Sequence, residues 1–413
     1  MNSIARKSKL EKIVITGASG FVGRQIVPLF VDCGAKLLLV GRDPAALSKM
    51  YPSLAVCGYE HLSQEAQGYD AVVHLATMNN DVAANLSEFE KVNIALPLQI
   101  IERIRCAGVK RFVNISTIHV LDRDNNSNYA RSKRALVERL KNVEGVKVVT
   151  LYLPLVYGAE WPKSVAVLNK LPKAVAASLF CLFASIKPTL HARKLFAHVM
   201  ENDLHGDAVL SDGQKYNRPF RFAKRMLDVG ASLVAMCVLW WLMLGVWAAV
   251  RLTSPGPGIF AQERVGRNGK HFYCLKFRTM KMDAPNVATH EVQPSYVTSF
   301  GKILRKYKVD ELPQLVNVLR GEMSLVGPRP SLPTQTELIN LRRTAEVLGL
   351  KPGISGLAQV NNIDMRDPYH LVCWDARYRT LQSLSMDMRI MVATICGRGV
   401  GDAVEYNIES GVS

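Results

Sequence analysis

The sequence predicts an α/β protein built in two parts, with a membrane-embedded helix between them. In the first part, short apolar strands alternate with helical stretches, a pattern typical of a Rossmann-type doubly wound parallel sheet. In the second part, an uncharged run at 229–250 precedes short strands and helices that predict a small α+β domain. We expect a basic N-terminal tail at 1–10, the sheet domain at 11–212, a linker at 213–222, the helix at 223–252, the α+β domain at 253–401 and a C-terminal tail at 402–413.

The composition favours partners that carry phosphate. The chain has 52 Lys and Arg against 35 Asp and Glu, a formal net charge of +17 that is spread over both halves. Nucleotides, nucleic acids and anionic membrane surfaces all suit such a charge. A nucleic-acid binder is the least favoured of these, because the basic residues lie among apolar and glycine motifs rather than in one stripe. The eight cysteines are scattered without a C-x-x-C motif, which argues against a zinc site or a disulfide framework.

The first strand is expected at 12–16, and it leads into a glycine-rich turn and a helix that runs to about residue 30. Gly17, Gly20 and Gly23 stand three apart, so that backbone can approach a pyrophosphate and the helix can pack on the strand. This predicts dinucleotide binding. After a second strand at 36–40, Arg42 would hold a 2′-phosphate and Asp43 a 2′-hydroxyl. Both remain open, with NADP slightly favoured over NAD.

Two further strands, at 71–76 and 111–116, complete the repeated strand and helix pattern. Tyr129 and Lys133 follow at a spacing of four, which puts them on one face of a helix. A nearby ammonium lowers the pKa of a tyrosine, whose hydroxyl can then exchange a proton with a sugar hydroxyl or ketone. An isolated pair of this kind would more simply be a surface Tyr and Lys.

Together these segments resemble the extended short-chain dehydrogenase/reductase family, specifically the nucleotide-sugar epimerases and reductases, over about residues 11–210. The matching pieces are TGASGFVG, YDAVVHLAT, Asn93, ISTIHV, YARSK and LPLVYG. The resemblance implies NAD(P) as cofactor and a UDP-sugar that is reduced or epimerised. It also implies a catalytic trio and a set of cofactor contacts, which are Thr117, Tyr129 and Lys133, and Gly17, Gly20, Gly23, Arg42, Asp43, Ala76 and Asn93.

Two departures leave an alternative open for this part. Only 12 positions separate Thr117 from Tyr129, where the family usually has a longer loop, and the substrate-binding C-terminal portion is short. The alternative is a non-catalytic module that binds NAD(P) or docks a partner.

The apolar run at 229–250 would be about 33 Å long as a helix, against about 30 Å for the hydrocarbon core of a bilayer. Cations lie on both sides of it, at Arg221, Lys224 and Arg225 and at Arg251, so charge asymmetry gives no topology. A helix that crossed the membrane would separate the two parts of the chain. A helix that enters one leaflet and returns would keep both on the cytoplasmic face, and this is the expected arrangement.

The second part combines an acidic pair with stiff cationic motifs. Asp310 and Glu311 are expected at the start of a helix, where backbone N–H groups favour negative charge and phosphate. Short strands at 262–266 and 275–280 carry cations, Arg329 stands between two prolines, and 351–360 reads as a glycine turn into a strand. An arginine held in this way suits a phosphate.

In this order, the motifs resemble the bacterial sugar transferases, the monotopic polyprenyl-phosphate phosphoglycosyl transferases, over about residues 221–400. KFRTM, DELPQLVNVLRGEMSLVGPRP and KPGISGLAQVN carry the resemblance. It implies that Asp310 attacks a UDP-sugar, expels UMP and forms an aspartyl-phosphosugar, which undecaprenyl phosphate then displaces. It further implies that Glu311 helps to hold Mg²⁺, and that the substrate phosphates meet Lys276, Arg278, Arg329 and the acidic position Asp387.

The resemblance also sets expectations about partners and location. It implies a bacterial inner membrane protein with both domains on the cytoplasmic face, and a donor that by family habit is a 2-acetamido-dideoxy hexose. Two departures stand out: Trp240-Trp241 falls about where the family bends its helix at Ser-Pro, and Asn362-Ile363 replaces Gly-Arg, so that Arg366 would supply the arginine. The alternative for the whole chain is a membrane scaffold with an inactive transferase. The sequence leaves the oligomeric state open, a homodimer included.

Overall fold

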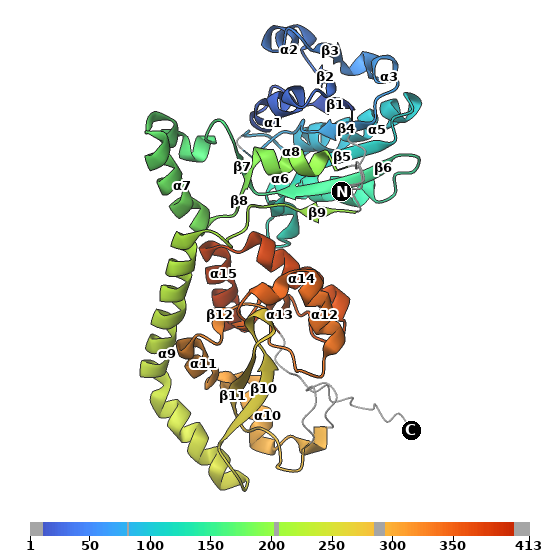
Figure 1. The fold of residues 1–413 in the computed structure, drawn as a ribbon. Coiled ribbons are helices and arrows are strands. Elements are labelled where there is room, and N and C mark those ends of the chain that lie inside the picture. Colours follow the sequence, from blue (N-terminus) through green and yellow to red (C-terminus); the bar gives the residue numbers. More distant parts are fainter. Residues whose placement is uncertain (1–10, 81, 202–205, 285–293, 400–413) are drawn as a thin grey trace, which may run out of the picture. The chain divides into compact units, whose positions relative to one another are not determined.

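The structure is a computed structural model that describes residues 11–80, 82–201, 206–284 and 294–399 (Figure 1). The predicted tails at 1–10 and 402–413 lie outside these residues. The chain divides into two compact units. The first contains Met1–Phe180 and Pro188–Asp212, and the second contains Cys181–Lys187 and Gly213–Ser413.

The first unit is a parallel sheet with helices on both faces, as predicted. Its main sheet has seven strands in the order β3-β2-β1-β4-β5-β6-β9, all paired in parallel. Its strands are β1 Lys12–Thr16, β2 Lys36–Gly41, β3 Ala55–Gly58, β4 Ala71–His74, β5 Arg111–Thr117, β6 Lys147–Leu153, β7 Leu155–Tyr157, β8 Thr189–His191 and β9 Ala208–Val209. Its helices are α1 Phe21–Asp32, α2 Pro44–Met50, α3 Leu62–Glu65, α4 Leu86–Glu90, α5 Leu96–Cys106, α6 Asn128–Leu140, α7 Lys173–Ile186 (shared with the second unit) and α8 Ala192–Val199.

Apolar side chains on both faces of the central strands explain why helices cover both faces of the sheet. Ile13 and Ile15 of β1 pack into one apolar cluster with Phe30 of α1 and Leu195 of α8. Val14, between them, packs into a second cluster formed with α3, α5 and α6. Successive side chains of a strand point to opposite faces, so a strand that is apolar at every position needs cover on both sides.

The second unit contains small two-stranded sheets and helices, in agreement with the predicted α+β domain. Its strands are β10 Ile259–Val265, β11 His271–Phe277, β12 Ser324–Val326 and β13 Gly353–Ser355. Its helices are α9 Arg218–Thr253, α10 Ser299–Lys306, α11 Gln314–Arg320, α12 Thr336–Thr344, α13 Leu357–Val360, α14 Pro368–Leu381 and α15 Leu384–Ile395. Strands β10 and β11 are antiparallel and place Phe260 opposite Lys276, whereas β12 and β13 are parallel.

The expectation of a turn leading into a strand at 351–360 is wrong in its order. The strand β13 occupies the glycine segment itself, and helix α13 follows it. The reason is close backbone packing. A Cβ added to Gly353 would lie 2.1 Å from the backbone nitrogen of Gly327, and one added to Gly327 would lie 2.4 Å from the carbonyl oxygen of Lys351. Only glycine permits this approach, which pairs β13 with β12 at the turn.

Helix α9 begins five residues earlier than predicted, so residues 218–222 are helical rather than part of the linker. Asn217 caps the helix by accepting a hydrogen bond from the backbone N–H of Phe220 at 3.2 Å, and Pro219 lies in its first turn. Both features favour a helix start. Within the described residues, α9 is the one helix long and apolar enough to cross a membrane. It contains 36 residues, about 54 Å, and continues through Trp240 and Trp241.

Both ends of α9 pack against the same unit. Near its start, Lys224 donates a hydrogen bond to the carbonyl oxygen of Val326 in β12 at 3.2 Å. Near its end, Val246 and Val250 are buried in a cluster with Phe277 and Leu304. Figure 1 shows the helix running along this unit from α15 to β10.

Candidate functional site

The acidic pair lies in a short turn before helix α11. Lys308 adopts a left-handed conformation with φ 56°, which ends the path of α10 and starts the 3-10 turn Val309–Glu311. Helix α11 begins only at Gln314, after Pro313. The pair therefore precedes the helix rather than forming its first turn, and Asp310 is only 5% exposed.

Two cations converge on one oxygen of this pair. The ammonium of Lys276 and the guanidinium of Arg329 each lie 3.1 Å from Oε1 of Glu311. All three side chains are largely buried, so the charges interact through a medium less polar than water. The structure thus brings four predicted residues together in one place, which are Asp310, Glu311, Lys276 and Arg329.

A buried asparagine fixes this geometry, and the sequence reasoning missed it. Asn317 of α11 has no exposed surface. Its oxygen accepts from the backbone N–H of Leu275 at 3.0 Å, and its nitrogen donates to the carbonyl oxygen of Tyr273 at 2.8 Å. These bonds join α11 to β11, so the turn that bears the pair and the strand that bears Lys276 keep one register. The available signal was a polar amide within the apolar run of α11, since such a group needs partners once buried.

A second missed pair supports the loop of Arg329. Arg342 and Asp375 form a buried ion pair at 2.7 Å, and Arg342 also donates to the backbone carbonyl of Arg329 at 2.8 Å. Burial raises the pKa of Asp375, while Arg342 lowers it. The loop is therefore held by a charge pair that has little contact with water.

Two predicted phosphate contacts have other partners. Arg278 donates to the carbonyl oxygen of Ser254 at 2.6 Å, just beyond the end of α9. Asp387 of α15 has no exposed surface. It forms an ion pair with Lys224 at 2.8 Å and accepts a hydrogen bond from the hydroxyl of Tyr378 at 2.7 Å. Burial raises the pKa of Asp387, and the charge of Lys224 offsets part of that rise. In this arrangement, Asp387 ties α9 to α15 and has no surface to offer a phosphate.

The donor set at the acidic pair suits Mg²⁺. Among the described residues, no group of three or more His, Cys, Asp or Glu could hold a metal ion. Mg²⁺ does not need one, because it keeps several waters and binds through one or two carboxylates together with substrate phosphates. Asp310 and Glu311 are neighbouring carboxylates of this kind.

In the first unit, the glycine turn is too tight for side chains. Gly17 has φ +76°, and a Cβ there would lie 2.5 Å from the backbone nitrogen of Ala76. A Cβ on Gly23 would lie 2.5 Å from the carbonyl oxygen of Ala18. The N–H of Gly20 donates to the carbonyl oxygen of Gly17 at 3.0 Å. The turn thus presents bare backbone at the start of α1, which fits a pyrophosphate.

The other predicted cofactor contacts lie around this turn in different ways. Asp43 caps α2 by accepting from the N–H of Ala46 at 2.9 Å, and Arg42 is exposed beside it. Asn93 is fully buried inside a π-helical turn, a rare form that recurs at functional sites. Its oxygen accepts from the N–H of Met78 at 2.8 Å, and its nitrogen donates to the hydroxyl of Ser132 at 3.0 Å. Asn93 therefore holds the loop after Ala76 against α6.

The predicted catalytic trio comes from β5 and α6. Thr117 is the last residue of β5, and Tyr129 and Lys133 lie one turn apart in α6. Burial raises the pKa of Tyr129, and the neighbouring hydroxyl of Thr117 offsets part of that rise. Lys133 is 1% exposed and donates to the carbonyl oxygen of Ile115 at 3.4 Å. Burial lowers its pKa to about 8. The ammonium of Lys133 is thus less stable than that of an exposed lysine.

Comparison with known proteins decides the family. Residues 219–398 match the family model described as bacterial sugar transferase. The UDP-glucose:undecaprenyl-phosphate glucose-1-phosphate transferase of Caulobacter vibrioides is 39% identical over 181 residues, which is 42% of this chain and 68% of that protein. The exopolysaccharide production protein ExoY of Rhizobium meliloti is 37% identical over 42% of this chain and 84% of that protein.

The chain belongs to the bacterial sugar transferase family. Residues 13–180 match the NAD dependent epimerase/dehydratase family. Both resemblances predicted from the sequence are therefore confirmed. Another relative is the UDP-glucose:undecaprenyl-phosphate glucose-1-phosphate transferase of Xanthomonas campestris pv. campestris, which is 37% identical over 45% of this chain. The chain spans only 40% of the length of that protein. Among solved structures, the Bordetella bronchiseptica enzyme WbmG in complex with NAD is 20% identical, over 50% of this chain and 74% of that chain, with a TM-score of 0.40.

Proposed function

We propose that the second unit transfers a phosphosugar from a UDP-sugar to undecaprenyl phosphate with release of UMP, and so initiates glycan assembly. The observation that carries this proposal is the turn of Asp310 and Glu311, with Lys276 and Arg329 3.1 Å from one oxygen of Glu311. Several relatives are undecaprenyl-phosphate sugar phosphotransferases, which supports the same reaction class.

In the first step, a carboxylate oxygen of Asp310 attacks the phosphorus that carries the sugar. The bond from this phosphorus to the bridging oxygen breaks, and UMP leaves with that oxygen. In the second step, an oxygen of undecaprenyl phosphate attacks the same phosphorus, the bond to Asp310 breaks, and the carboxylate is restored. Lys276 and Arg329 neutralise charge on the phosphate oxygens. Glu311 would help to hold Mg²⁺, which supplies further neutralisation when bound.

The packing of α9, a single helix from Arg218 to Thr253, supports a membrane contact that leaves both of its ends on one side of the bilayer. Both ends of α9 contact the same compact unit, at Lys224 and at Val250, and a helix crossing the bilayer would carry its ends to opposite sides. Between these points, large apolar side chains face outward, with Trp240 62%, Trp241 61% and Leu244 57% exposed. We place this face in the inner membrane with the catalytic residues on the cytoplasmic side, where a lipid phosphate and a soluble nucleotide sugar can both reach Asp310.

The test is direct. Purified protein should release UMP when it is incubated with Mg²⁺, undecaprenyl phosphate and a panel of UDP-sugars, 2-acetamido-dideoxy hexoses included. Mass spectrometry of the intact protein after brief exposure to the donor alone should show one phosphosugar adduct. Absence of UMP release across a broad panel would sink the proposal and favour an inactive membrane scaffold.

We further propose that the first unit binds NAD(P) and reduces or epimerises the UDP-sugar donor. The bare backbone at Gly17 and the trio of Thr117, Tyr129 and Lys133 support this assignment. The cofactor supplies hydride transfer when bound. Tyr129 exchanges a proton with the sugar hydroxyl, Thr117 positions the phenol, and the ammonium of Lys133 favours its ionisation.

The cofactor assignment predicts a contrast between two glycines of equal backbone strain. Gly17→Ala and Gly34→Ala both place a Cβ at positive φ, +76° and +80°, at a cost of about 1 kcal/mol each. Only at Gly17 does the new Cβ meet backbone, since nothing lies within 4 Å at Gly34. Titration calorimetry with NAD⁺ and NADP⁺ should therefore show binding lost in Gly17→Ala and kept in Gly34→Ala. Equal binding by both variants would contradict the assignment.

The catalytic assignment predicts that Tyr129→Phe lowers donor conversion by about 10²- to 10⁴-fold, the usual contribution of a proton-transferring group. Cofactor binding should be unchanged, because the ring remains and only the hydroxyl is removed. The sugar mass in the lipid-linked product reports the conversion. If that product is the same in Tyr129→Phe and wild type, the unit is a binding or docking module instead.

A further inference from the structure

A cationic cavity lies in the second unit at the other end of helix α11 from the acidic pair. It has a volume of about 1160 Å³ and is lined by residues 213–216, α9, the β10–β11 turn, β12, α12, the stretch 346–351 and the end of α14. None of Asp310, Glu311, Lys276 and Arg329 lines it. Arg225 marks its position, because it donates to the carbonyl oxygens of Val318 and Leu319 at 2.7 and 2.8 Å, at the C-terminal end of α11.

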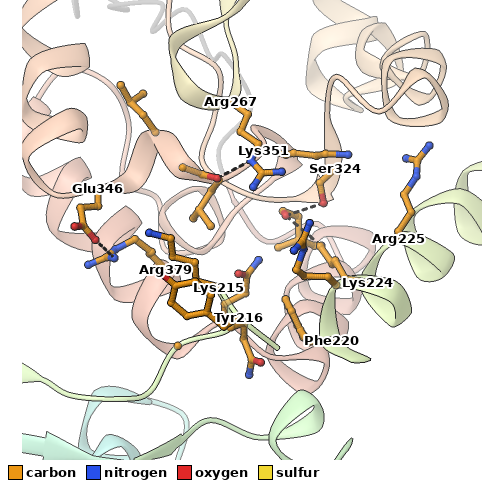
Figure 2. Close-up of a pocket in the computed structure, with 18 of the residues that line it drawn as sticks. Lys215, Tyr216, Phe220, Lys224, Arg225, Arg267, Ser324, Glu346, Lys351 and Arg379 are labelled. Atoms are coloured by element: carbon orange, nitrogen blue, oxygen red, sulfur yellow. Dashed lines mark hydrogen bonds and ion pairs between the residues drawn. The ribbon is translucent and has the colours of Figure 1, made fainter. Parts of the chain in front are cut away.

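The lining has a strong excess of positive charge. Nine Lys and Arg side chains contribute to it, against two carboxylates. Both carboxylates already have cationic partners, Glu346 with Arg379 at 2.7 Å and Asp228 with Lys224 at 3.4 Å. Figure 2 shows Arg225, Arg267 and Lys351 on three separate segments around the cavity.

Two of these cations lie near Gly321, and their charges act on one another. The Nζ atom of Lys351 and an Nη atom of Arg225 lie 3.5 and 3.8 Å from the point where a Cβ on Gly321 would stand. Burial lowers the pKa of Lys351, and the charges of Arg225, Arg267 and Lys224 lower it further. Like charges held together in a partly buried cavity repel, and an anion placed among them would convert that repulsion into attraction.

The surroundings favour a lipid as the source of the anion. Phe222 also lines the cavity and is 70% exposed, and Met226, one turn further along α9, is 56% exposed. The apolar stripe continues outward through Leu233 and Val234. A basic cluster next to an apolar membrane segment suits an anionic headgroup, whose acyl chains would lie along this stripe.

We propose that this cavity binds the phosphate group of an anionic phospholipid, at a site separate from the transfer site. The phosphate contacts Arg225 of α9, Arg267 of the β10–β11 turn and Lys351. The acyl chains contact Phe222 and Met226. The placement of α9 in a membrane rests on the proposed function, whereas the charge and volume of the cavity do not.

The experiment uses the full chain in neutral detergent micelles that contain either phosphatidylglycerol or phosphatidylcholine. Native mass spectrometry counts bound lipid, and thermal unfolding measures the stabilisation. Phosphatidylglycerol should remain bound and raise the unfolding temperature, and Lys351→Gln and Arg267→Gln should each weaken this binding about tenfold. Without anionic lipid, Lys351→Gln should unfold at a higher temperature than wild type, because it removes a repelling charge.

Lys270→Gln is the matched control. Lys270 follows Arg267 on the same turn, is exposed and does not line the cavity, so its loss should leave lipid binding unchanged. Equal binding of phosphatidylglycerol by Lys351→Gln, Lys270→Gln and wild type would overturn the proposal. Pyrophosphate added to phosphatidylcholine micelles separates the two sources of phosphate. If it stabilises the protein and phosphatidylglycerol does not, the lipid assignment fails. Failure of the protein to enter any lipid micelle would instead contradict the proposed role of α9.

Discussion

Replacing Asp310 with asparagine should lower UMP release by at least about 10³-fold, which is the scale of loss when a catalytic nucleophile is removed. The side chain keeps its size, so the turn between α10 and α11 should persist. The amide oxygen, however, is a poor nucleophile and forms no acyl phosphate. The phosphosugar adduct seen by intact-protein mass spectrometry should therefore disappear together with turnover.

The control for this variant is Glu337→Gln, which also removes one carboxylate charge but lies exposed in the first turn of α12. It should behave as wild type in both measurements. If Asp310→Asn retained UMP release and an adduct of unchanged mass, another residue would be the nucleophile. Glu311→Gln gives a useful third case. It should lower the rate without abolishing the adduct, because it weakens the contacts with Lys276 and Arg329 and leaves Asp310 in place.

Replacing Lys224 with methionine should destabilise the second unit by about 3–5 kcal/mol, the usual cost of leaving a buried charge without its partner. Lys224 lies 2.8 Å from Asp387 and 3.4 Å from Asp228, and both carboxylates are buried. Asp228 retains its bonds from the hydroxyl of Ser324 and the N–H of Leu325. Asp387 retains the hydrogen bond from Tyr378, one partner against the two of Asp228, so most of the loss should arise there. Denaturant unfolding monitors the loss.

The double variant Lys224→Met with Asp387→Leu separates a structural role from a catalytic one. Removing both charges should restore most of the stability, since apolar side chains of similar size replace buried pairs at little cost. If Asp387 acts only through packing, UMP release should return as well. A stable double variant without UMP release would show that Asp387 handles the phosphate, as the family resemblance implies.

Local sequence patterns were enough to predict much of the fold. Strand β1 has the predicted bounds, because an apolar run between charged residues and a glycine turn leaves few alternatives. The face assignment of Tyr129 and Lys133 likewise follows from helical spacing, and both residues lie in α6 near Thr117. The start of α9 was missed, since Asn217 and Pro219 lie in a polar stretch that resembles a linker until the cap is seen.

Local sequence patterns could not predict the contacts between segments that are distant in the sequence. Lys276 lies in β11 and Arg278 directly follows that strand, yet Lys276 contacts Glu311 and Arg278 contacts Ser254. Asp387 and Lys224 lie far apart in the sequence, and only folding makes them an ion pair. The cationic cavity has the same origin, because its side chains come from separate segments of the second unit.

The sequence by itself therefore determined the two fold types, their order, the family and the identity of the reacting carboxylate proposed here. Those properties depend on residue type and short spacing, which the chain states directly. The tertiary structure decided which cations meet Glu311, that Asp387 is buried, and that both ends of α9 pack on one unit. These properties depend on long-range packing and on the need of buried charges for partners, and neither can be read from neighbouring residues alone.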